Sequence, residues 1–279
     1  MTLMASGHKT LVTLLPEVVS LFPVEVRKRG INRAYHEYEH TLRLLDQVVA
    51  QLDLGPRVLD VGAGAGVIPL VLARWGADVH VVDTWTEYAP EYDNQMGTAD
   101  DFLRRFEENG VASQRVDVFE EPLPYPNATF DLVTMFSVIE HLHGSPAGVL
   151  EEIKRVLRPK GYLVLSTPNI ASLQNRLRLL AGRTIHFPLR DWYYGQPFTG
   201  HVREYTLAEL YQMMGFLGLR VMHSDLSESP RYNTRLAGDR WLAEFRINSL
   251  YQVLKALYFA VVWLWPSLRY SITIIAQKP

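Results

Sequence analysis

The sequence predicts an α/β protein built around a mostly parallel, doubly wound sheet, and three observations support this. Residues 58–61 are mostly apolar and β-branched, as in a buried strand, and they lead through a glycine-rich turn into a helical pattern. A second apolar run ends at Asp83, about twenty residues after the first glycine of that turn. Further along, short apolar runs alternate with helical patterns, which is typical of parallel strands joined by helical crossovers.

Two segments precede the first strand. Residues 1–33 are expected to form an N-terminal extension, of which residues 1–30 pack as a lid or a peripheral turn. A helix is predicted over residues 34–52, because apolar side chains recur there at helical spacing: Leu42, Leu45, Val48, Val49 and Leu52.

The turn after the first strand reads GAGAG over residues 62–66. Glycine is favoured there because it accepts positive φ angles and because a bare backbone lets a ligand approach. A dinucleotide fingerprint would need a third glycine where Val67 stands, so a nucleotide-dependent oxidoreductase is disfavoured. Asp60, just before the turn, suits a cationic ligand better than a pyrophosphate. The plainest alternative is a strand-to-helix turn that binds nothing.

The later elements follow from the same periodicities. Helices are predicted at residues 100–109, which Asn109-Gly110 would cap, at 150–157 before the Pro159-Lys160-Gly161 turn, and at 207–215. Strands are predicted at residues 77–83, 115–119, 130–136, 162–166, 219–223 and 270–276.

Length and composition restrict the class of protein. With 279 residues, a single domain over residues 1–279 is expected. The 28 basic and 30 acidic residues give a net charge of -2, which disfavours nucleic acid as a partner held by charge. The absence of cysteine excludes disulfides and thiolate metal sites. No signal-peptide pattern is found, so a cytoplasmic location is expected.

Together these features resemble the class I S-adenosylmethionine-dependent methyltransferases, in the branch of the type 11, 12 and 23 domains. The resemblance covers roughly residues 35–225. It implies S-adenosylmethionine as the cofactor and a Rossmann-like, seven-stranded sheet in the order 3-2-1-4-5-7-6, with the last strand antiparallel and helices on both faces. Besides the turn and Asp83, the matching segments are Asp117-Val118, Phe130-Asp131, VIEHL at 138–142, RPKG at 158–161, STPN at 166–169 and GHVREYT at 200–206.

The resemblance also implies which residues contact the cofactor. Asp60 and the backbone of the turn would hold its amino-acid end. Asp83, with Thr84 or the tryptophan after it, would hold the ribose, and Asp117 with the next amide would hold the adenine. Phe136 would lie near the sulfonium, with core packing as the alternative. The predicted cofactor-binding residues are Asp60, Gly62, Ala63, Gly64, Gly66, Asp83, Thr84, Asp117, Val118 and Phe136.

Two histidines are candidates for the catalytic base. Methyl transfer is an in-line displacement, so the protein must align a nucleophile about 3 Å from the methyl group and remove a proton if the acceptor is a hydroxyl. His141 follows the predicted fourth strand, and His201 lies in the loop before the predicted sixth. Histidine suits proton removal near neutral pH. The alternative for each is a surface or helix-capping histidine.

A metal centre is a further alternative. Glu140, His141 and His201 resemble part of the site in small-RNA 3′-terminal ribose methyltransferases, which bind a metal through two glutamates and two histidines. Ser137 stands where the first glutamate would be, so one ligand is missing. Catalysis without a metal is therefore expected.

Two insertions are predicted. Residues 170–206 would form a substrate lid, in which Arg176, Arg178, Arg183 and the aromatic run 192–194 bind an anionic acceptor or form a solvated face. Residues 227–268 would form a hydrophobic helical insertion before the last strand. Its apolar run is too short to span a bilayer. Residues 248–266 would instead pack in the core, join a second copy, or lie at a membrane surface.

The predicted function is methyl transfer from S-adenosylmethionine to an acceptor, with a hydroxyl of a small molecule, glycan or lipid-linked precursor favoured. The alternatives are a non-catalytic binding module of the same fold and a metal-dependent ribose O-methyltransferase. A lipid-linked acceptor would bring the protein to the inner face of the membrane.

Overall fold

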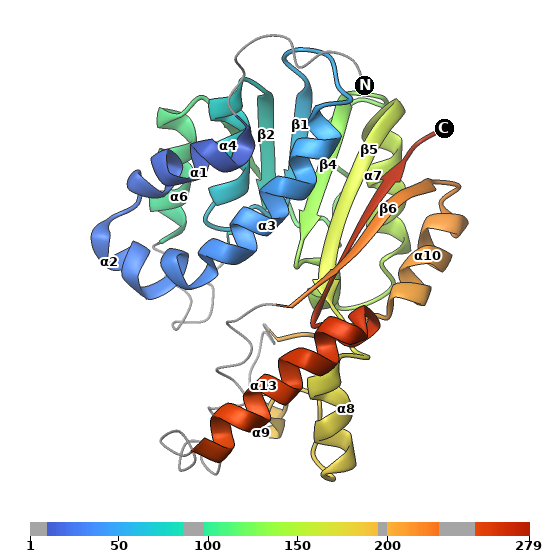
Figure 1. The fold of residues 1–279 in the computed structure, drawn as a ribbon. Helices are drawn as coiled ribbons and strands as arrows, with labels where there is room; N and C mark the ends of the chain where they lie inside the picture. The colour runs from blue at the N-terminus through green and yellow to red at the C-terminus, as the bar shows by residue number, and fades with distance from the viewer. Residues whose placement is uncertain (1–9, 86–97, 195–199, 229–248) are drawn as a thin grey trace, which may run out of the picture. The chain divides into compact units, whose positions relative to one another are not determined.

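The computed structural model describes residues 10–85, 98–194, 200–228 and 249–279. Within these ranges, seven strands form one sheet in the order β3-β2-β1-β4-β5-β7-β6 (Figure 1). The predicted α/β fold and strand order are confirmed. The strands are β1 (Arg57–Val61), β2 (Asp78–Asp83), β3 (Ala112–Arg115), β4 (Phe130–Phe136), β5 (Leu157–Pro168), β6 (Arg220–Ser227) and β7 (Ser271–Gln277).

The chain forms two compact units. Unit 1 comprises Met1–Met135 and Glu151–Tyr162, and unit 2 comprises Phe136–Leu150 and Leu163–Pro279. The expectation of a single domain with insertions at 170–206 and 227–268 stays a prediction.

The strands of unit 1 are parallel. β1 pairs with β2 and with β4, and β2 pairs with β3. In this register Asp60 of β1 stands opposite Val81 of β2 and Thr134 of β4. Because parallel strands run in the same direction, the carboxyl ends of β1 and β2 lie along one edge, where ligands of such sheets bind. The glycine turn begins at this edge.

The N-terminal segment forms a buried helix, and the predicted lid or peripheral turn is wrong for residues 11–20. Leu11, Leu15 and Val18 of α1 (Leu11–Ser20) are fully buried, and Figure 1 shows α1 close to α3 (Asn32–Val49) and α4 (Val67–Trp75), against which it packs. Pro16 and Glu17, which interrupt the apolar pattern in sequence, lie on the exposed face of the same helix. The other elements of unit 1 are α2 (Val24–Val26), the π-helical turn η1 (Arg27–Ile31) and α6 (Ala99–Glu108).

One predicted strand position is wrong, and another predicted strand is too short. β3 occupies Ala112–Arg115 instead of 115–119, and its side chains are exposed or half-buried. An edge strand of this kind lacks the apolar run that marks the central strands. Residues after it form a turn, in which the Glu121 amide donates to the Asp117 carbonyl at 2.8 Å. β5 contains the predicted strand 162–166 and extends beyond it at both ends, from Leu157 to Pro168.

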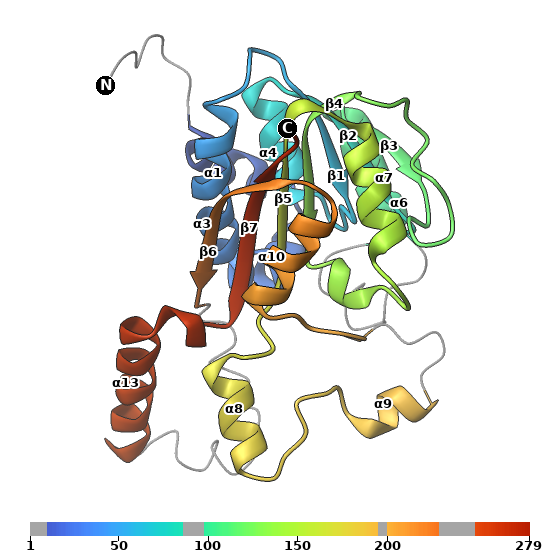
Figure 2. The same ribbon diagram turned by 90° about the vertical axis from the view of Figure 1, so that its right-hand side faces the viewer.

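Unit 2 contains the antiparallel end of the sheet. β6 and β7 pair antiparallel, with Leu226 opposite Ile272, and α10 (Leu207–Phe216) packs against both (Figure 2). Its other elements are η2 (Ile139–His141), α8 (Leu173–Leu180), α9 (Leu189–Tyr194), α13 (Ser249–Leu264) and η3 (Pro266–Leu268), while α7 (Ala147–Val156) runs from unit 2 into unit 1.

The apolar helix α13 buries only part of its surface. Tyr258 and Val262 are buried, but the following apolar side chains of the helix and its end are exposed: Val253, Leu254, Leu257, Trp263, Leu264 and Trp265. This exposure does not fit burial of the helix in the core, one of its three predicted roles. Contact with a second copy or with a membrane surface stays a prediction. None of the described helices is both long enough and apolar enough to cross a membrane.

Candidate functional site

The glycine turn links β1 to α4 in unit 1. Gly62, Gly64 and Gly66 have φ angles of 75°, 52° and 82°, which side chains of other residues rarely allow. The Gly62 amide donates to the penultimate carbonyl of β2 at 2.8 Å, and the Gly66 amide donates to the Ala63 carbonyl at 2.9 Å. Gly66 has a second constraint, because a Cβ there would lie 2.1 Å from Cε1 of Phe106. The turn is therefore fixed by hydrogen bonds and by a buried ring.

Asp60 of β1 is a buried carboxyl just before this turn, with 4% of its surface exposed. Its Oδ1 accepts a hydrogen bond from the Thr134 hydroxyl of β4. Burial raises the pKa of Asp60 to about 7, the charge of Asp83 acts in the same direction, and the hydrogen bond from Thr134 opposes both. A nearby positive charge would lower this pKa again, because it stabilises the ionised form.

Asp83, at the end of β2, is hydrogen-bonded to the turn. Its Oδ2 accepts from the Gly64 amide at 2.8 Å, and its Oδ1 accepts from the Trp85 amide at 3.0 Å. The Thr84 hydroxyl lies 3.4 Å from the same Oδ1. Trp85 is buried, donates through Nε1 to the Gly64 carbonyl at 3.3 Å, and packs on Phe106. Each carboxylate oxygen can accept more than one hydrogen bond, so these contacts are compatible with a ligand hydroxyl as a further donor.

The remaining predicted cofactor residues lie in two places. The Val116 amide donates to the Asp83 carbonyl at 3.0 Å, which places the exposed Asp117 and the half-buried Val118 just beyond the paired ends of β2 and β3. Phe136, which is half-buried, is the last residue of β4 and belongs to unit 2. Unit 1 therefore brings together the two acidic strand ends, the glycine turn and the turn after β3.

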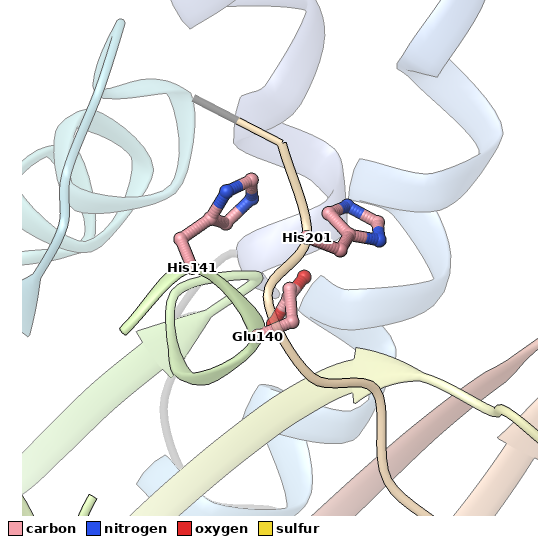
Figure 3. Close-up of side chains that lie close together, drawn as sticks. All are labelled: Glu140, His141 and His201. Atoms are coloured by element: carbon pink, nitrogen blue, oxygen red, sulfur yellow. The ribbon is translucent and has the colours of Figure 1, made fainter. Parts of the chain in front are cut away.

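A second group of polar side chains lies in unit 2. Glu140 and His141 are on η2, His201 is on the loop before α10, and their candidate ligand atoms all lie within 4.8 Å of one another (Figure 3). The rings of the two histidines meet edge to face, with centroids 4.9 Å apart. The Val202 amide donates to the Glu140 carbonyl at 2.7 Å, which ties the loop to η2. The two predicted catalytic histidines are thus neighbours.

Glu140 is fully buried at this centre. Its Oε2 accepts from the Thr167 hydroxyl of β5 at 3.0 Å, whereas its Oε1 has no hydrogen-bond partner among the described residues. Burial raises the pKa of Glu140 to about 7, and the nearby His201 opposes this effect. A buried polar atom left without a partner costs about 1–3 kcal/mol, so its presence calls for an explanation.

His201 is held in place by Glu204. The Nδ1 atom of His201 lies 2.8 Å from Oε1 of Glu204, and the two side chains are only 18% and 17% exposed. Glu204 also accepts a hydrogen bond from Asn175 at 3.3 Å, and the Phe187 ring packs against His201. A carboxylate at Nδ1 fixes the tautomer and orientation of the imidazole, so Nε2 is the atom that can act on a ligand.

The predicted substrate lid also lies in unit 2. Arg176 on α8 is exposed, and its Nε donates to the Ala171 carbonyl at 2.8 Å. The aromatic residues 192–194 on α9 are exposed, and Tyr193 packs edge to face on Tyr194. Binding of an anionic acceptor here stays a prediction.

Three residues of these sites are not predicted as site residues, namely Thr134, Thr167 and Glu204, although Thr167 and Glu204 lie in the matching segments STPN and GHVREYT. The two threonines lie within strands, where threonine is common, so only the tertiary contacts reveal what they hold. Glu204 follows His201 by three positions, but on a loop this spacing does not by itself predict a contact.

The chain is similar to known proteins in sequence and in structure. A family model described as a methyltransferase domain matches residues 33–224. The ubiquinone biosynthesis O-methyltransferase of Xanthomonas oryzae pv. oryzae is 36% identical over 126 residues, which make up 45% of this chain and 48% of that protein. The chain thus spans about half the length of the curated relatives it matches.

Solved structures of similar fold include a chain of the Haloferax volcanii complex that contains the Trm112 methyltransferase activator. The TM-score is 0.54 at 16% identity, over 98% of this chain and 100% of that one. An S-adenosylmethionine-dependent methyltransferase from Mesorhizobium loti gives a TM-score of 0.50 at 16% identity, over 83% of this chain and 96% of that one. At these identities the similarity is one of fold alone.

Proposed function

This chain belongs to the methyltransferase-domain family, and from that premise we propose that it transfers a methyl group from S-adenosylmethionine to an acceptor hydroxyl. One observation carries the proposal: two acidic strand ends flank a glycine turn whose amide is hydrogen-bonded to Asp83. The cofactor carries a sulfonium and an ammonium group, so acidic side chains and an open backbone suit it better than they suit a phosphate.

Different residues of unit 1 bind different parts of the cofactor. Asp60 balances the positive charge of the amino-acid end, and its ionisation is favoured when that charge is close. Asp83 accepts hydrogen bonds from the ribose hydroxyls, the role of an acid at the end of the second strand in nucleotide-binding sheets. Asp117 and the Val118 amide bind the edge of the adenine ring. The bound cofactor supplies an electrophilic methyl carbon.

The residues of unit 2 act on the acceptor. A hydroxyl becomes a stronger nucleophile when its proton is removed as the methyl group is transferred. We assign proton removal to the pair His141 and His201. Support comes from their mutual contact and from Glu204, which orients one of the two rings.

The acceptor class is inferred from the relatives and from the predicted lid. The curated relatives named for ubiquinone biosynthesis are O-methyltransferases, which supports a hydroxyl on a small molecule. The exposed aromatic residues 192–194 and the exposed Arg176 support an acceptor that combines an apolar part with an anionic group, such as a lipid-linked precursor. A glycan acceptor has no comparable support in the described residues.

A non-catalytic binding module is the alternative of a different class. Isothermal titration calorimetry with S-adenosylmethionine tests the cofactor site, and transfer of labelled methyl groups to small-molecule fractions of a cell extract tests turnover. We expect binding near one equivalent, a labelled O-methyl product and release of S-adenosylhomocysteine. Binding without transfer to any fraction would favour the binding module, and absence of binding would contradict both functions.

A further inference from the structure

Glu140 has a property that proton removal by histidine does not explain. A histidine base needs one accessible ring nitrogen and one group that orients the ring, and Glu204 already orients His201. Glu140 is nonetheless fully buried beside both histidines, with one carboxyl oxygen hydrogen-bonded and the other without a partner among the described residues. The proposed reaction assigns no role to this carboxyl group.

Neither protonation state of Glu140 satisfies its Oε1 atom. A protonated carboxyl would need an acceptor for its hydrogen, and an ionised one would need a donor or a cation. The described residues supply neither to Oε1, while the Thr167 hydroxyl holds the other oxygen at 3.0 Å. The unpartnered oxygen belongs to the same cluster as the two histidines (Figure 3).

We propose that Glu140, His141 and His201 bind a divalent transition-metal ion. Two imidazoles and one carboxylate form a ligand set that suits first-row ions such as Zn²⁺ and Mn²⁺, and they leave at least one coordination position open. The ion satisfies Oε1 of Glu140. Glu204 completes the arrangement as a positioning residue, because metal-binding histidines typically donate their second ring N–H to a carboxylate.

The size of the cluster is close to that of a loaded site. Ligand atoms about 2.0–2.2 Å from one ion lie about 3–4 Å from each other. The candidate ligand atoms here lie within 4.8 Å of one another, so binding requires a contraction of the cluster. Both histidine side chains are half-buried, so small adjustments of these two side chains can bring their ring nitrogens closer to Glu140, which Thr167 holds.

The open coordination position gives the ion a role in catalysis, and this role rests on the proposed function. An acceptor hydroxyl at that position would have a lower pKa, as water does on zinc, and would release its proton to solvent water. While the ion is bound, His141 and His201 serve as its ligands, and in the ion-free protein they are the bases proposed above. This departs from the metal-free centre that the sequence predicts on account of Ser137. Metal binding itself does not depend on the identity of the acceptor.

Co²⁺ is the probe for this site, because its visible absorption reports coordination by nitrogen and oxygen ligands. The full-length protein, stripped with a chelator, is titrated with Co²⁺ and then with Zn²⁺ as competitor. We expect absorption that saturates at one equivalent and is displaced by Zn²⁺. Glu140→Gln and His201→Ala should each weaken Co²⁺ binding at least tenfold, and Glu204→Gln should weaken it by about 10–100-fold while keeping the spectrum. His223→Ala, an exposed histidine on β6, is the matched control.

Two outcomes overturn the metal site. One is wild-type protein without saturable absorption, and the other is unchanged Co²⁺ binding in both Glu140→Gln and His201→Ala. Circular dichroism checks that each variant is folded, and if Glu140→Gln unfolds, the half-buried His201 provides the test. Calorimetry with S-adenosylmethionine on the same samples reports separately on the cofactor site, so its failure is distinguishable from failure of the metal site.

Discussion

Replacing Gly66 with alanine tests whether the buried ring of Phe106 shapes the glycine turn. The φ angle of Gly66 is 82°, and an alanine in this left-handed region costs about 1–2 kcal/mol. The new Cβ would also lie 2.1 Å from Cε1 and 2.4 Å from Cζ of Phe106. Phe106 is fully buried and packs on Trp85, so relieving this overlap adds about 1–3 kcal/mol. The free energy of unfolding should fall by about 2–5 kcal/mol.

Gly110→Ala is the matched control. Gly110 has a φ angle of 69°, but a Cβ at this position would meet no described atom within 4 Å, so only the conformational cost of about 1–2 kcal/mol applies. Urea denaturation measures both losses, and calorimetry measures cofactor binding. Binding should weaken in Gly66→Ala alone, because a shifted turn moves the Gly64 amide away from Asp83.

The double variant Gly66→Ala/Phe106→Leu isolates the steric part of this effect. A smaller side chain at position 106 removes ring atoms from the path of the new Cβ, so part of the loss caused by Gly66→Ala should be recovered. Equal losses in Gly66→Ala and Gly110→Ala, or no recovery in the double variant, would refute the reasoning.

Three further predictions concern the charged residues. Asp83→Asn should weaken S-adenosylmethionine binding by about 10–100-fold in calorimetry, because hydrogen bonds to a charged group contribute about 1.5–3 kcal/mol; undiminished affinity would contradict the ribose role. The pKa of Asp60 is about 7 in the folded state and 3.8 in the unfolded state, so the folded state binds more protons between these two pH values. The free energy of unfolding should therefore fall by up to about 4 kcal/mol as the pH rises from about 4 to about 7. Asp60→Asn should remove that part of the slope in denaturation curves, and parallel profiles would show that the buried carboxyl is ionised throughout. His201→Ala should lower kcat/KM by about 10²–10⁴-fold, whereas Glu204→Gln should lower it less and shift the pH profile; equal losses with unshifted profiles would contradict a positioning role.

Local patterns predict much of unit 1. The glycine turn stands between an apolar strand and an apolar helix, and Asp83 closes the next strand, so short stretches of sequence suffice to locate both. The local pattern does not predict α1, because Pro16 and Glu17 interrupt its apolar run, yet both lie on the exposed face of the helix. The position of β3 is not predicted either, because its side chains at the sheet edge are too exposed to form an apolar run.

The sequence by itself determined the fold class, the strand order through its family resemblance, and the identity of the acidic and histidine candidates. Only the tertiary structure decided that Glu140 is fully buried with one oxygen unpartnered among the described residues, that Glu204 orients His201, and that a ring from α6 closes against Gly66. The physical reason is that strands, helices and turns follow from neighbouring residues, whereas burial and contacts between distant segments depend on how the whole chain packs.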